Sequence, residues 1–215
     1  MTVKRITYLT RRADLTPEQF SAHWSTVHAE IARDLPRVVA YRQNHLARPD
    51  EPRTPSPPDT SERWELDGIV ELWFEDAEAA AAGFGSAVAD RLIVDERRFL
   101  SGLVGGAVDA PAPPTEQTGK LWLLWEAVPV ARDEVDADVA ALAAALGARS
   151  AQVNVRQDEA PVLSRDDLRR QDLPALAVAF SFASVSEARG AGEAVRSDPR
   201  ARGAQVLVAE EVPII

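Results

Sequence analysis

The strand and helix signals of this 215-residue chain occur in the same order twice. In the first half, apolar runs and alternation predict strands at residues 3–11, 38–46, 67–74 and 99–108. Helical spacing predicts one helix from the N-cap Thr16 to the residue before Pro36, and another over residues 77–88. In the second half, the same signals predict strands at 120–128, 149–157, 175–183 and 204–212, with helices at 133–146 and 186–196. Each half therefore has the order β-α-β-β-α-β, which is typical of a ferredoxin-like unit.

A single ferredoxin-like unit carries its helices on one face of its sheet, so the other face has to be covered. Two units in one chain can cover each other. The predicted fold is therefore α+β, with two tandem ferredoxin-like units forming one intramolecular barrel around a cavity. The units are predicted at residues 1–108 and 120–215, joined by a Pro-rich linker at 109–119, and residues 47–63 are predicted to form a long surface loop. Two unrelated α+β domains are the alternative.

Composition narrows the classes of partner and chemistry. The net charge is −10 and neither half is basic, which argues against nucleic acid or an anionic membrane as the partner. The chain has no cysteine, so disulfides, Fe–S clusters and thiol catalysis are excluded. No apolar run reaches the length of about 18 residues that a membrane span needs. The first residues lack the apolar core of a signal peptide, so a cytoplasmic protein is expected.

The three histidines lie close together in the sequence, in the predicted first helix and second strand. Trp24 and His28 are four residues apart and share a helix face. His23 is five residues from His28, about 140° around an α-helix, and is predicted to lie on the surface outside any site. His28 follows the apolar stripe of the helix, so a core histidine without a chemical role is its alternative.

Alternation on the strands predicts which polar side chains meet. Tyr41, Gln43 and His45 share one face of the second strand, which is predicted to face the barrel cavity. On the next strand, Glu71 and Trp73 are predicted to point into the same cavity. A carboxylate in such surroundings has a raised pKa unless it is paired. The alternative for Glu71 is a structural ion pair with an arginine such as Arg42 or Arg11.

Four separated motifs of the first half occur in an order that resembles the EthD family of dimeric α+β barrel proteins. They are Leu15-Thr16-Pro17-Glu18-Gln19-Phe20, Trp24 with His28, Tyr41-x-x-Asn44-His45, and Asp67-Gly68-x-x-Glu71-Leu72-Trp73-Phe74. The resemblance covers residues 3–105 and implies the barrel fold. It also implies a role in the breakdown or tailoring of small organic molecules, because relatives include a component linked to ether degradation, a methylmuconolactone isomerase, and fungal proteins that dehydrate or decarboxylate aromatic polyketides. The second half resembles the family only in its element order.

The second repeat lacks the titratable groups of the first. Aligning the repeats places Val153 at Tyr41, Gln157 at His45, Phe180 at Glu71, Phe182 at Trp73 and Ala143 at His28. One half is therefore predicted to carry the chemistry and the other to supply an apolar wall.

These patterns predict a cofactor-independent acid/base enzyme of the isomerase or lyase type, acting on a small apolar or aromatic molecule. His45 is the first candidate proton carrier, His28 the second, Tyr41 a hydrogen-bond donor, and Glu71 the group that orients an imidazole or takes the proton. Trp24, Gln43 and Trp73 are predicted to contact the substrate. No metal and no cofactor is predicted. A non-catalytic binding protein is the main alternative. Further alternatives are a heme bound by one of the histidines and a metal ion held by His28, His45 and Glu71. A homodimer stays open.

Overall fold

The computed structural model describes residues 2–47, 63–109, 112–113 and 118–215. Its N-terminal half consists of β1 (Val3–Arg11), α1 (Pro17–His23), a π-helical turn (Trp24–His28), α2 (Ala29–Ala32), β2 (Val38–Leu46), β3 (Gly68–Phe74), α3 (Ala77–Phe84), α4 (Ala87–Phe99) and β4 (Leu100–Val108). The first helix begins as predicted, because Thr16 and Gln19 form a capping box. The predicted loop at 47–63 lies almost wholly outside the described residues, and so does most of the predicted linker.

The C-terminal half follows the same order with one added short strand. It consists of β5 (Gly119–Trp125), α5 (Arg132–Leu146), β6 (Ser150–Val155), β7 (Leu163–Ser164), β8 (Leu176–Phe182), α6 (Val185–Val195), a 3₁₀ turn (Pro199–Ala201) and β9 (Gln205–Pro213). None of the helices in the described part of the chain is long and apolar enough to cross a membrane.

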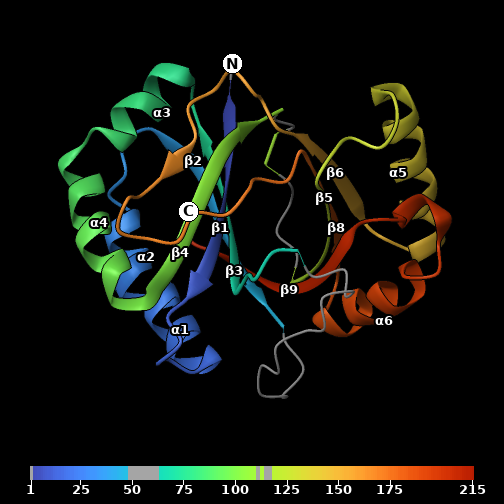
Figure 1. Cartoon of the computed structure of the whole chain (residues 1–215), viewed down its shortest axis with the longest axis horizontal. Coiled ribbons are helices and arrows are strands. Elements are labelled where there is room, and N and C mark those ends of the chain that lie inside the picture. The colour runs from blue at the N-terminus through green and yellow to red at the C-terminus, as the bar shows by residue number, and fades with distance from the viewer. Residues whose placement is uncertain (1, 48–62, 110–111, 114–117) are drawn as a thin grey trace.

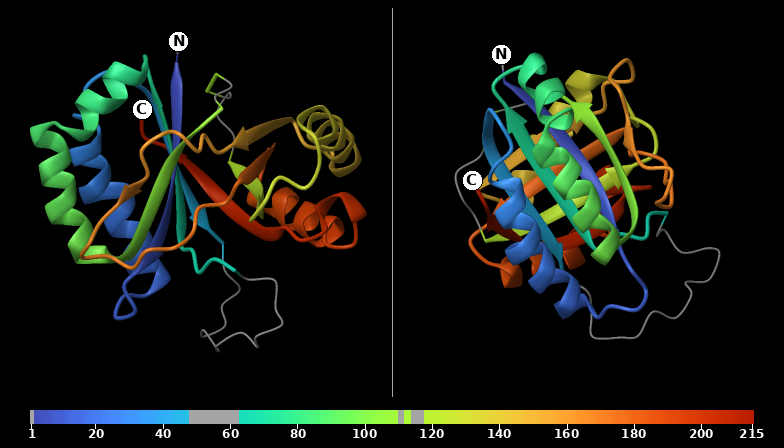
Figure 2. Two further views of the ribbon diagram at one scale, coloured as in Figure 1. Left: turned by 45° about the horizontal axis from the view of Figure 1, so that its top comes forward. Right: turned by 90° about the vertical axis from the view of Figure 1, so that its left-hand side faces the viewer.

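All nine strands belong to one curled sheet, with the order β6-β8-β5-β9-β2-β3-β1-β4-β7. The two halves join edge to edge, because β2 pairs with β9 in antiparallel register. The far edges also meet at one end, where Val108 and Arg156 form a bridge and the amide of Asp109 donates to the carbonyl of Val155 at 3.0 Å. Figure 1 shows the resulting curl, and Figure 2 shows the helices of each half on its outer side. The prediction of tandem ferredoxin-like units in an α+β barrel is confirmed.

Side chains fill much of the interior of the curled sheet, and a cavity of about 900 Å³ lies beside them, with Trp64, Val104, Gly106 and Leu173 in its lining. An apolar cluster that includes Ile6, Tyr8, Ile69, Trp122 and Leu124 occupies part of the interior. A buried network of ions occupies another part: Lys4 Nζ lies 2.7 Å from Glu71 Oε1, and Lys120 bridges Glu71 and Glu211. Because Lys4 and Glu71 come from one half and Lys120 and Glu211 from the other, the network ties the two repeats together.

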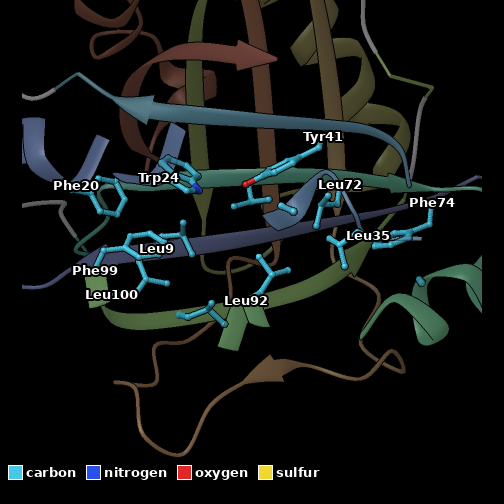
Figure 3. Packing of buried hydrophobic residues seen from close by; sticks show 14 of the residues in the cluster. Leu9, Phe20, Trp24, Leu35, Tyr41, Leu72, Phe74, Leu92, Phe99 and Leu100 are labelled. Atoms are coloured by element: carbon cyan, nitrogen blue, oxygen red, sulfur yellow. The ribbon is translucent and has the colours of Figure 1, made fainter. Parts of the chain in front are cut away.

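The outer face of the N-terminal sheet packs against α1 to α4. Figure 3 shows this core, in which Phe20, Trp24, Phe99 and Leu92 from the helical side meet Leu9, Tyr41, Leu72 and Leu100 from the strands. Helix α4 was not predicted beyond residue 88, yet it contributes much of this packing.

Candidate functional site

A cavity of about 120 Å³ lies between the outer face of the N-terminal sheet and its helices. Most of its lining is apolar and includes Leu9, Leu35, Leu72, Leu92 and Leu103. Five polar side chains also reach it, namely Thr7, His28, Tyr41, Glu96 and Arg165. A mostly apolar pocket with a few converging polar groups is the usual form of a small-molecule site.

His28 sits in the π-helical turn, with its side chain lining the cavity. Its Nδ1 lies 3.1 Å from Asp95 Oδ2, and its Nε2 has no hydrogen-bond partner among the described residues. Burial lowers the pKa of His28, and the contact with Asp95 opposes that shift without cancelling it. Neutral His28 therefore donates its Nδ1–H to Asp95, which leaves the Nε2 lone pair as the proton acceptor.

His23 is a partner of this pair rather than an isolated surface residue. Its Nε2 lies 3.0 and 3.1 Å from the two carboxylate oxygens of Asp95. The prediction that the two histidines diverge was wrong, because it assumed an α-helix. A π-turn brings residues five apart toward one side. His23 does not itself line the cavity. Burial opposes ionisation of Asp95, but the hydrogen bonds from His28 and His23 outweigh it and lower the pKa of Asp95.

We expect Asp95→Asn to lower the pKa of His28 further, because it removes the charge that favours the imidazolium. A ¹H–¹⁵N NMR titration of the histidine rings measures this directly. Asp90→Asn, an exposed change on the same helix, should leave the His28 titration unchanged. An unchanged or raised pKa of His28 in Asp95→Asn would contradict the pairing.

Glu96 brings a carboxyl group to the same cavity from α4. Its side chain is only 14% exposed, and Arg165 Nη1 donates to its Oε2 at 2.6 Å. Burial raises the pKa of Glu96 to about 7, with Arg165 opposing the shift and Asp95 and Asp167 adding to it. Glu96 is therefore close to half protonated at neutral pH.

Arg165 belongs to the C-terminal half but reaches the N-terminal cavity. The chain between β6 and β8 extends to the free edge of β4, where Val104 pairs with Ser164 and Gly105 with Leu163. Figures 1 and 2 show this segment, in orange, running along that edge. Leu163 and Arg165 thereby close one side of the cavity. The second repeat therefore contributes Leu163 and the cation of Arg165, whereas the residues predicted as its apolar wall pack in the C-terminal half and do not line this cavity.

Tyr41 lines this cavity, which lies on the helical side of the sheet, so the prediction that Tyr41 faces the interior of the barrel was wrong. Its hydroxyl accepts a hydrogen bond from Gln43 Nε2 at 2.9 Å, and the same nitrogen donates to the carbonyl of Trp24 at 2.9 Å. Burial raises the pKa of Tyr41 well above its ordinary value. Tyr41 therefore stays protonated and acts as a hydrogen-bonding group. Gln43 and Trp24 support it from outside the cavity lining.

His45 does not line this cavity, so the prediction that His28 and His45 share it was wrong. The ring of His45 packs against Trp24 with centroids 4.4 Å apart. Its Nδ1 lies 2.6 Å from Ser21 Oγ and its Nε2 lies 3.0 Å from Gln43 Oε1, so both ring nitrogens are occupied. Burial lowers the pKa of His45 to about 4, which makes it neutral near pH 7.

Glu71 and Trp73 point to the opposite face of the sheet, which corrects the prediction that they share a cavity with Tyr41. The register pairs Tyr41 with Leu72 and Arg42 with Glu71, and directly paired residues share a face. Burial opposes ionisation of Glu71, but Lys120 and Lys4 outweigh it and lower the pKa of Glu71 to about 2. Trp73 lies under Lys4 Nζ, 4.5 Å from its ring centroid.

Glu71 has a structural ion-pairing role, as considered above, but its partners are not the expected arginines. The partners are lysines, whereas Arg42 lies 3.9 Å from Glu211 and Arg11 lies 3.3 Å from Asp67. Glu71 cannot share a metal ion with His28 and His45, because the sheet separates it from both rings. Among the described residues, no group of three or more His, Cys, Asp or Glu could hold a metal ion.

Sequence reasoning missed Asp95, Glu96 and Arg165. The sequence does carry a signal for the helix that holds the two acids. Ser86 is its N-cap, and Leu92 and Phe99 follow at helical spacing after it. Arg165 had no such signal, since it lies beside a two-residue strand in a segment without periodicity.

Comparisons with known proteins agree with the fold and find one family model that matches much of the first repeat. Residues 12–102 match the family model described as the EthD domain. A search of curated proteins gives no match. Among solved structures, an anthrone oxidase-like protein is similar with a TM-score of 0.62 and 10% identity, over 98% of this chain and 91% of that one.

Two further solved structures share the fold over almost the whole chain. A putative monooxygenase from Lactobacillus acidophilus NCFM has a TM-score of 0.53 and 10% identity, over 100% of this chain and 94% of that one. A putative chlorite dismutase also has a TM-score of 0.53 and 10% identity, with coverage of 99% and 95%. At this identity the likeness is one of fold, the dimeric α+β barrel.

Proposed function

We propose that this cavity, most of whose lining comes from the residues that match the EthD domain model, binds a small aromatic or otherwise apolar molecule and moves a proton on it. The observation that carries the proposal is that Glu96 and His28 converge on one mostly apolar cavity. Burial also raises the pKa of Glu96 to about 7, which suits proton transfer at neutral pH. The volume of about 120 Å³ is close to that of cavities of ~150 Å³ that take up benzene.

Two groups can carry protons in this cavity. Glu96 is populated in both forms near pH 7, so it can remove a proton and return it. His28 offers its Nε2 lone pair, while Asp95 holds the other side of the ring and stabilises the imidazolium that forms. One group to take a proton and another to deliver one are what isomerisation, dehydration and decarboxylation need. We therefore propose an isomerase or lyase type of reaction.

The size of this cavity disfavours heme as its ligand. A porphyrin has four pyrrole rings and is several times larger than a cavity of about 120 Å³. A binding protein without catalysis remains the second candidate, since an apolar pocket alone would serve it.

Exchange of a carbon-bound proton tests the proposal. 2-Indanone carries one aromatic ring and an activated C–H bond, and ¹H NMR in D₂O follows the loss of that hydrogen. We expect the protein to accelerate exchange in a saturable way. Saturable binding without acceleration would establish a binding protein without catalysis, and the absence of binding would overturn the proposed site. Running the assay with and without O₂ shows whether the deprotonated molecule goes on to consume oxygen.

A further inference from the structure

The hydrogen bonds around Tyr41 run in one direction. Gln43 Nε2 lies 2.9 Å from the Trp24 carbonyl oxygen and 2.9 Å from the Tyr41 hydroxyl. A peptide carbonyl only accepts hydrogen bonds, so the amide nitrogen of Gln43 has to face Trp24. The same nitrogen then donates to Tyr41, whose oxygen is the acceptor.

His45 continues this chain on the other side of Gln43. The amide oxygen of Gln43 faces His45 Nε2 at 3.0 Å, so Nε2 has to carry the hydrogen. The neutral ring then presents a lone pair at Nδ1, which accepts from Ser21 Oγ at 2.6 Å. Donation therefore runs from Ser21 to His45, then to Gln43, and ends at the oxygen of Tyr41.

The hydrogen of the Tyr41 hydroxyl is left for the cavity. Its acceptor is not among the described residues, although the side chain is only 2% exposed. The indole nitrogen of Trp24 points toward the same hydroxyl in Figure 3, but an indole N–H is a donor and cannot accept. A buried donor without an acceptor is costly, so an acceptor atom in the cavity would stabilise the site.

We propose that the cavity selects molecules with a neutral acceptor oxygen, namely aromatic aldehydes or ketones, with Tyr41 donating to that oxygen. Gln43 and His45 are positioning residues that hold the donor direction. The inference rests on the proposed function and names its substrate class. A neutral carbonyl is favoured over a carboxylate, because the cation of Arg165 is already paired with Glu96 and the carboxylate of Asp95 lies beside the cavity. In a ketone with a hydrogen on the carbon next to the carbonyl, donation to the oxygen also acidifies that C–H, which Glu96 or His28 would deprotonate.

Benzaldehyde and styrene test this selection, because they are nearly isosteric and only the aldehyde has an acceptor oxygen. Isothermal titration calorimetry gives both dissociation constants. We expect the protein to bind benzaldehyde more tightly than styrene by about 3- to 10-fold, the size of one net hydrogen bond. Tyr41→Phe removes a single oxygen atom and should abolish the preference. Tyr8→Phe, which changes the chain's other tyrosine on the opposite face of the sheet, should retain it.

Gln43→Leu tests the positioning role, since it frees the Tyr41 hydroxyl to donate to the Trp24 carbonyl instead. We expect the preference to fall toward that of Tyr41→Phe, with circular dichroism confirming that the variant is folded. A preference that survives in Tyr41→Phe would overturn the assignment of the donor, and one that survives in Gln43→Leu would overturn the positioning role. Binding of neither compound to the unchanged protein would overturn the proposed function itself, and equal binding of both would overturn only the selection.

Discussion

Glu96→Gln is expected to slow proton exchange on 2-indanone by about 10²- to 10⁴-fold, the usual contribution of a general acid or base. The amide keeps nearly the same shape and can still contact Arg165, but it cannot take up a proton. Binding of the ketone should change much less than the rate, because the apolar lining is intact. The same substitution at the exposed Glu30 should leave the rate unaltered. An equal rate in Glu96→Gln and the unchanged protein would exclude Glu96 as the proton carrier.

The raised pKa of Glu96 should also make the free energy of unfolding depend on pH. Folding raises this pKa from 4.5 to about 7, so proton binding to Glu96 stabilises the folded chain fully below pH 4.5. That contribution is lost as the pH rises through about 7. Urea unfolding between pH 4.5 and 8 should therefore show a decline that Glu96→Gln reduces. A variant with the same decline would contradict the raised pKa.

Lys120→Met is expected to lower the free energy of unfolding by about 3–5 kcal/mol, the range measured when one partner of a buried ion pair is removed. Lys120 bridges Glu71 and Glu211 inside the barrel, where none of the three side chains is more than 1% exposed. Removing the ammonium group of Lys120 leaves the buried carboxylates of Glu71 and Glu211 with fewer positive charges beside them. Urea denaturation measures the change.

Arg91→Met is the matched control, because Arg91 pairs with Asp34 at the surface, where both side chains are more than half exposed. We expect a change of about 1 kcal/mol or less for this exposed pair. A similarly small effect of Lys120→Met would show that the ion network does not hold the two repeats together. Because the network lies on the face of the sheet away from the cavity, folded Lys120→Met should still bind 2-indanone.

The order of the elements could be predicted because hydrophobic periodicity and capping residues are local signals. Thr16, Asp76 and Ser184 each begin a helix with the side-chain hydrogen bond that their residue type favours. The face that β2 turns to the helices could not be predicted, since its middle residues are buried on both faces and offer no alternation. An error of one residue in phase moves every side chain across the sheet, and it sent Tyr41 and Glu71 to the same side.

The candidate site was predicted in part for similar reasons. His28 and Tyr41 were found because polar side chains stand out on apolar elements. His23 was misplaced because the π-turn changes the helical period. Arg165 reaches the cavity through two long-range strand pairs, which no local pattern encodes. His45 and Tyr41 were predicted to share a cavity, but the structure connects them through Gln43, and His45 lies outside the cavity lining.

The most direct test of the central claim is to locate the bound ketone by NMR, using nuclear Overhauser effects between 2-indanone and the methyl groups of the isotope-labelled protein. The proposed site predicts contacts to Leu92, Leu103 and Val70, which line the cavity between the helices and the sheet. Contacts to Leu124, Ile69 or Val108 instead would place the ligand inside the barrel and contradict the account.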